Sequence, residues 1–120
     1  MTDLQEELKQ FTGGTEHWYR HHMNRKVTYT DGVKYLAEKA GAYWLVDDIC
    51  AAYQIDTEVR SVPFQVWKLE VNQDDHTAVL RLEDGNDNLV KSYDITFTDF
   101  PLTEIILWFT DNTLLLPCEY

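Results

Sequence analysis

The chain has 120 residues with 10 Lys and Arg against 21 Asp and Glu, which gives a formal net charge of −11 at pH 7. Its length suits one domain covering residues 1–120, and its 44% hydrophobic content is typical of globular proteins rather than of disordered acidic tails. The longest wholly apolar run, Ile105–Phe109, is far shorter than the ~20 residues of a membrane-spanning helix. The charged N-terminus also lacks the apolar core of a signal peptide. We therefore expect an acidic cytoplasmic protein with no membrane contact.

The first half of the sequence predicts helices interrupted by one short strand. A capping box at Thr2 and Gln5 indicates a helix over about residues 3–11. Apolar residues recur at helical spacing over 31–40 and again over 42–54, with a bend at Gly41 between them. Before these helices, the β-branched and aromatic segment 26–30 predicts a strand. Residues 16–22 fit either a strand or a helix.

From Pro63 onward the period of the apolar residues changes from helical to alternating, as in FQVWKLEV over residues 64–71. About five strands joined by short turns fit residues 63–117, with the sequence DGNDN predicting a hairpin turn. Helices followed by strands in blocks indicate an α+β fold. We expect an antiparallel β-meander with the N-terminal helices packed on one face.

One segment runs against the acidic composition, because no Asp or Glu occurs between His17 and Thr30. It combines cations with aromatic rings, which suit a phosphate or carboxylate group and the ring of a nucleotide. Ion pairing with the many carboxylates of the domain is the alternative use of these cations. The candidate ligand-binding residues are Trp18, Tyr19, Arg20, His21, Arg25 and Lys26.

Metal and cofactor sites find little support in the sequence, and we expect neither. His17 and His21 lack a third ligand, and the DGNDN loop lacks the glycine and the final glutamate of a calcium-binding EF-hand. Cys50 and Cys118 are too few for a zinc site of the CxxC type, and free thiols fit a reducing cytosol. Catalytic motifs such as a P-loop or a nucleophile elbow are also absent, which favours a binding protein over an enzyme.

The acidic residues are concentrated in the second half, where residues 61–120 carry 3 basic and 11 acidic groups, a net charge of −8. The negative electrostatic potential of so many carboxylates repels nucleic acid but attracts a basic protein. Ordinary solubility is the alternative explanation of the charge. The candidate partner-binding residues lie in turns and are Asp74, Asp75, Asp84 and Asp87.

Several segments together resemble a small bacterial family of unknown function whose members occur on chromosomes, plasmids and phages. They are GTEHWYRH (14–21), TDGVKYLAEKAGAYWLVDDI (30–49), FQVWKLEV (64–71), TDFPL (98–102) and LLPCEY (115–120). The resemblance covers nearly the whole chain and implies an accessory or counter-defence factor that acts by binding. Other members end in Pro-Ser-Glu-Tyr where this chain has Pro117-Cys118-Glu119-Tyr120, which argues against a general role for the Cys118 thiol.

Three functional hypotheses follow. The first is a non-enzymatic protein that binds another, basic protein through its acidic half. The second is a small anionic-ligand or nucleotide-binding domain, with or without enzymatic activity, that uses segment 17–26. The third is a self-associating structural domain in which the apolar segments Ile105–Phe109 and Leu114–Leu116 form a dimer edge.

Overall fold

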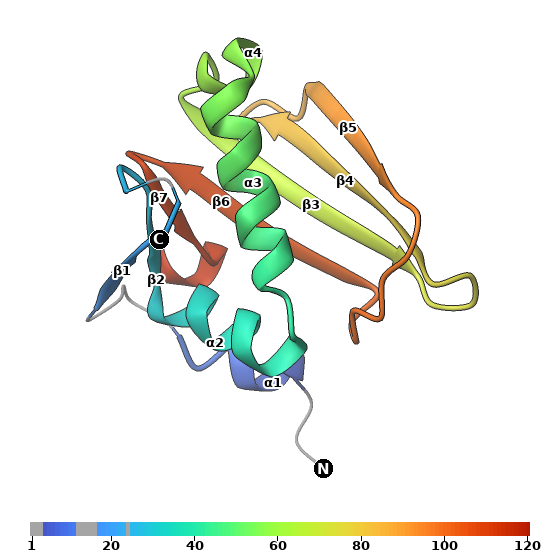
Figure 1. Cartoon of the computed structure of the whole chain (residues 1–120). Coiled ribbons are helices and arrows are strands. Elements are labelled where there is room, and N and C mark those ends of the chain that lie inside the picture. Colours follow the sequence, from blue (N-terminus) through green and yellow to red (C-terminus); the bar gives the residue numbers. More distant parts are fainter. Residues whose placement is uncertain (1–3, 12–16, 24) are drawn as a thin grey trace.

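The computed structural model describes residues 4–11, 17–23 and 25–120 (Figure 1). The helices are α1 (Leu4–Leu8), α2 (Asp31–Ala40), α3 (Tyr43–Ile55), α4 (Thr57–Arg60) and the short 3-10 helix η1 (Pro117–Glu119). The strands are β1 (Trp18–Arg20), β2 (Thr28–Thr30), β3 (Phe64–Asn72), β4 (Thr77–Asp84), β5 (Leu89–Ile95), β6 (Glu104–Thr110) and β7 (Thr113–Leu115).

The seven strands of these described residues form one sheet, in the order β1-β2-β7-β6-β3-β4-β5. Neighbours are antiparallel except β2 and β7, which are parallel. The predicted α+β class is therefore confirmed, and the sheet has more strands than the five predicted for residues 63–117. Five strands do occur within residues 63–117, and β1 and β2 extend the sheet. β2 lies within the predicted strand over 26–30, and β1 lies within residues 16–22, which fitted either a strand or a helix. With three residues each, neither strand is long enough to show alternation.

The strands do not follow one another as a simple meander. β3, β4 and β5 are joined by hairpins, but β6 then returns to pair with β3 instead of β5. This order, with the fourth strand beside the first, is a Greek key. Alternation identifies a strand without specifying its neighbours. One clue is that β6 buries Leu107 and also half-buries Trp108 on the other face, which suits an interior strand.

The helix boundaries near Gly41 follow from local chemistry. The Thr30 hydroxyl caps α2 by accepting the backbone N–H of Val33, and Gly41 ends the helix in the left-handed conformation at φ 61°. The predicted helices over 31–40 and 42–54 correspond to α2 and α3 within a residue. The predicted helix over 3–11 is shorter, ending at Leu8, and its capping residue Thr2 lies outside the described ranges.

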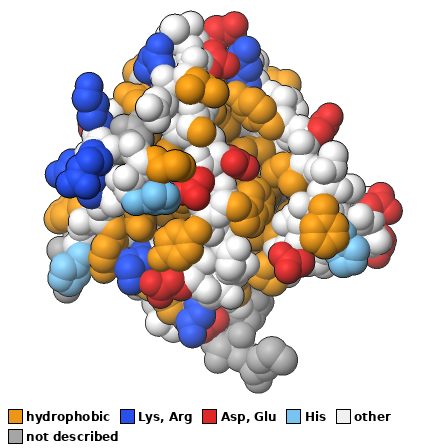
Figure 2. Space-filling model, viewed as in Figure 1, with side chains coloured by type: hydrophobic (Ala, Val, Ile, Leu, Met, Phe, Trp, Pro, Cys, Tyr) orange, Lys and Arg blue, Asp and Glu red, His pale blue; other side chains and the backbone are white. Residues whose placement is uncertain are grey.

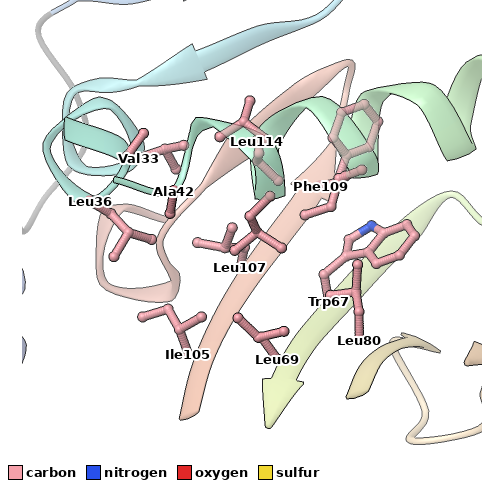
Figure 3. Close-up of a cluster of buried hydrophobic side chains, with 14 of the residues drawn as sticks. Val33, Leu36, Ala42, Trp67, Leu69, Leu80, Ile105, Leu107, Phe109 and Leu114 are labelled. Carbon is pink, nitrogen blue, oxygen red and sulfur yellow. The ribbon is translucent and has the colours of Figure 1, made fainter. Parts of the chain in front are cut away.

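The alternating residues of β3, β4 and β6 place one face of the sheet in the hydrophobic core (Figure 3). α3 lies across this face, with the ring of Tyr53 4.8 Å from the ring of Phe109. Cys50 on α3 is buried in the core, and burial raises the pKa of its thiol to about 12. The thiol thus behaves as a small apolar group, as predicted, and Cys118 is also free.

The C-terminal residues connect to the start of α2 through a buried carboxylate. Glu119, only 5% exposed, accepts hydrogen bonds from the Thr30 hydroxyl at 2.6 Å and from the backbone N–H of Gly32 at 3.1 Å. The backbone N–H of Leu116 donates a third bond at 3.0 Å. A helix N-terminus favours such a negative charge. These three hydrogen bonds fasten residues 116–119 to the start of α2.

No helix within the part of the chain that the structure describes is long and apolar enough to cross a bilayer.

Candidate functional site

A groove of about 550 Å³ lies between α3 and the outer strands β4 and β5. Figure 1 shows α3 crossing the sheet while β5 has no such helix in front of it. In Figure 2 hydrophobic side chains gather in the hollow beside this helix, with acidic side chains near its edge. A concave, mainly apolar surface with few polar groups is the usual form of a binding site.

One face of α3 forms the wall of the groove. Asp48, Ala51, Ala52 and Ile55 follow the spacing i, i+3, i+4 and i+7, which brings them onto one side of a helix. The two alanines keep this wall shallow. Ile55 is 79% exposed although it is a large apolar residue.

The floor of the groove comes from the core-facing residues of the two outer strands. Leu80 of β4 is buried, whereas Tyr93 and Ile95 of β5 are half-buried. The Tyr93 ring stacks on Trp67 with ring centroids 6.3 Å apart. Burial raises the pKa of the Tyr93 hydroxyl, so this group is neutral at physiological pH and can donate a hydrogen bond at the floor.

Asp48 is the distinctive charge of the groove. Partial desolvation, and secondly repulsion from Asp47, raise the pKa of its carboxyl group. It forms no ion pair with any Lys or Arg of the described chain. Asp56, by contrast, caps α4 and lies 3.5 Å from the ammonium group of Lys91. Asp94 borders the groove on β5, but alternation with Tyr93 directs its side chain toward the other face.

The predicted anionic-ligand segment forms β1, the following turn and the approach to β2. Trp18 is 60% exposed, and Arg20, Arg25 and Lys26 are exposed as well. Arg20 donates a hydrogen bond to the backbone carbonyl of Arg25, which brings these two cations together. Trp18 and Arg20 share one side of β1 because residues two apart in a strand do so. Four of the six predicted residues are thus exposed to solvent.

The other two predicted residues of this segment serve the fold. The Tyr19 hydroxyl donates to Asp31 at 3.0 Å, and this bond is the main reason why the pKa of Tyr19 is raised. His21 is only 2% exposed, and its Nε2 lies 2.7 Å from Asp47 Oδ1. The backbone N–H of Met23 donates to Nδ1 of His21 at 3.3 Å. These bonds attach the turn after β1 to α3.

His21, His22 and Asp47 bring potential metal-ligand atoms within 4.8 Å of one another. Both ring nitrogens of His21 already form hydrogen bonds, however. Since Nδ1 accepts from Met23, the ring proton resides on Nε2 and points to Asp47. A metal ion at Nε2 would have to displace this proton. Hydrogen bonding therefore accounts for the cluster, and the expectation of no metal stays a prediction.

The four acidic residues predicted as a partner surface lie in two separate turns. Asp74 and Asp75 belong to the β3–β4 turn, whereas Asp84 and Asp87 belong to the β4–β5 turn, at the opposite end of β4. Asp84 accepts the backbone N–H of Asn86 and Asn88, which lowers the pKa of its carboxyl group. These bonds define a turn, as predicted for DGNDN. The four carboxylates do not form one continuous surface.

The predicted dimer edge is not at an edge of the sheet. β6 and β7, which contain Ile105–Phe109 and Leu114–Leu115, are interior strands, and the edges are β1 and β5. Their apolar side chains fill the core instead.

The groove and its wall residue Asp48 were not identified from the sequence. Two signals were available. Ile55 continues the helical stripe beyond the residues needed for the core, and two adjacent alanines precede it. What the sequence lacked was the position of β5, which closes the other side of the groove.

Comparison with known proteins gives a family for the whole chain. A family model described as "Family of unknown function (DUF6876)" matches residues 2–120, so the chain belongs to this family. No curated protein and no solved structure matches it.

Proposed function

We propose that this member of the DUF6876 family is a non-enzymatic binding protein that holds a basic, partly apolar segment of another protein in the groove beside α3. The observation that carries the proposal is the combination of an open apolar groove with Asp48 on its wall, a carboxylate that forms no ion pair with the Lys and Arg residues that the structure describes. Apolar contacts supply the binding energy, and the carboxylate selects a cation.

The charge of the whole molecule supports a basic partner. Residues 61–120 carry a net charge of −8, and this half of the chain includes the floor of the groove. Long-range attraction accelerates encounter with a cationic protein and weakens as salt is added. Two free thiols fit the reducing cytoplasm in which we place the protein. An accessory or counter-defence factor of a plasmid or phage would act in this way on a basic nucleic-acid-binding protein.

The test uses two labelled peptides that differ only in charge, one made of Leu and Lys and the other of Leu and Glu in the same order. Fluorescence anisotropy measures their binding to the purified protein at low and high salt. We expect the Lys peptide to bind, with affinity falling as salt rises, and the Glu peptide to bind at least about tenfold more weakly, a difference of roughly 1.4 kcal/mol.

Variants of the protein decide whether the groove is responsible. Ala51→Trp fills the groove from its wall, and Gln54→Trp adds the same side chain to an exposed position of α3 that does not line it. Asp48→Asn removes the groove charge, and Asp74→Asn removes one charge from an exposed turn. We expect only the first member of each pair to weaken binding. Equal effects within both pairs would contradict the proposal and indicate a diffuse charge attraction.

A second candidate function rests on the exposed side chains of the β1–β2 region. Trp18, Arg20, Arg25 and Lys26 offer an aromatic surface beside three cations, which suits a phosphate-bearing ring compound. Titration of ATP, monitored by tryptophan fluorescence, tests it, with the double variant Arg20→Gln/Arg25→Gln as control. A change in emission that the variant abolishes would support this function, and an unchanged spectrum would oppose it.

A further inference from the structure

We infer that the segment held in the groove is an amphipathic α-helix that lies alongside α3 and completes the helical layer over β4 and β5. The inference rests on the function proposed above, because it specifies the conformation of the bound segment. Three features of the groove favour a helix over an extended strand.

The first feature is the layer in which the groove lies. Its floor is the core-facing surface of Leu80, Tyr93 and Ile95, and its wall is α3. A ligand in this space therefore occupies the same layer as α3. An added β-strand would instead pair with the outer edge of β5 and extend the plane of the sheet, where it would leave this floor uncovered.

The second feature is the shape of the wall. Two packed helices approach to 8–10 Å between their axes, about the lower value where small residues meet. Ala51 and Ala52 provide such small residues in the middle of the stripe. Asp48 stands one turn before them and Ile55 one turn after. An apolar stripe of a partner helix would cover the alanines and Ile55, and a cation on its flank would reach Asp48.

The third feature is the edge of β5, which is poorly suited to accept a strand. The pairing of β4 and β5 is irregular at Leu82 and Glu83, and Lys91 of β5 forms ion pairs with Asp56 and Glu58 near α4. Bulges and charged side chains are the usual means of protecting an edge strand from pairing. The open face is thus more accessible than the open edge.

The length of the wall sets the length of the helix. α3 has 13 residues and extends about 20 Å at 1.5 Å per residue. A partner helix of about 14 residues would cover the full groove. Apolar residues at i, i+3, i+4 and i+7 would face the floor and the alanines, and Lys or Arg would flank this stripe.

The experiment compares three peptides of 14 residues, of which the first two contain Leu and Lys in equal numbers and the third differs from the first at one position. One has the apolar residues at helical spacing, the second has them in strict alternation, and the third has the helical order with a central Pro in place of a Leu. Anisotropy gives the affinities, and circular dichroism measures the helix content gained on binding. We expect the helical peptide to bind at least about tenfold more tightly than either other peptide and to gain helicity.

The outcomes separate the inference from the function on which it rests. If the alternating peptide binds as tightly as the helical one and Ala51→Trp weakens the binding of both peptides, the groove binds basic segments. In that case the inference that the bound segment is helical is wrong. If no peptide binds, or if binding is insensitive to Ala51→Trp, the proposed function fails as well. A helical peptide whose binding is weakened by Ala51→Trp but not by Gln54→Trp supports both.

Discussion

The two ends of the sheet use their polar groups differently. Near β1, β2 and β7, the polar side chains that leave the solvent are bonded, as Glu119 is to Thr30 and Gly32 and as His21 is to Asp47. Near β4 and β5, Asp48 is partly desolvated without a cation beside it, and Ile55 is exposed. Bonded polar groups stabilise the fold, whereas a charge without an ion pair beside apolar surface is the feature on which the proposed binding site rests.

The largest effect is expected from removing the carboxylate that connects the chain end to α2. Glu119→Ala leaves a hydroxyl and two backbone N–H groups without their acceptor in a buried site. We expect the free energy of unfolding to fall by about 3 to 4 kcal/mol. Chemical denaturation measures the loss, with Glu104→Ala at an exposed position as the control. A loss no larger than that of the control would show that the bonded end of the sheet does not depend on this carboxylate.

A somewhat smaller effect is expected when the same site is crowded instead of emptied. A Cβ atom on Gly32 would come within 2.6 Å of Glu119 Oε1 and of Leu116 Cδ1. Gly32→Ala should therefore destabilise the protein by about 2 to 3 kcal/mol, as overpacking does. Gly85→Ala is the matched control, because its Cβ would meet Phe64 only at 3.8 Å. Equal melting temperatures for the two variants would contradict the close approach at Gly32.

Loss of the His21–Asp47 bond should cost less, about 1 to 3 kcal/mol, since one buried pair is affected. His21→Ala removes the buried ring, and His22→Ala removes its exposed neighbour. Thermal unfolding should show a clear decrease only for the first variant. If added Zn²⁺ raised the melting temperature of the parent protein and either variant abolished the increase, the two histidines would be metal ligands instead.

The smallest effect, and one of opposite sign, is expected at the open end of the sheet. The raised pKa of Asp48 means that its charged form opposes folding at neutral pH. Asp48→Asn should therefore raise the melting temperature at pH 7, by about 2 °C, while it weakens peptide binding. This destabilisation vanishes when the carboxyl group is protonated in both the folded and the unfolded state. The difference in melting temperature between Asp48→Asn and the parent protein should therefore disappear below a pH of about 3.9, the ordinary pKa of an aspartate. A destabilised variant at pH 7 would mean that Asp48 serves the fold.

The sequence was most informative where local chemistry decides the structure. Thr30 and Gly41 specify the ends of α2, and alternation identifies β3, β4 and β6. It was least informative about pairing, since the apolar pattern of β6 is the same whether its neighbour is β5 or β3. The groove depends on that pairing, because moving β6 to the far side of β3 leaves β5 as an edge. Segment 17–26 shows the same limit, as no local pattern distinguishes buried His21 from exposed Arg20.

The parallel pairing of β2 with β7 has a consequence for the order of events during synthesis. Thr28 and Thr113, whose hydroxyl groups lie 3.1 Å apart, are separated by 85 positions in the chain. During translation, β2 and α2 therefore leave the ribosome long before their pairing partners β7 and Glu119 are synthesised. The hairpins β3–β4 and β4–β5 join near neighbours and can form early, whereas contacts between distant segments form slowly. The β1–β2 end is thus the last part of the nascent sheet to close.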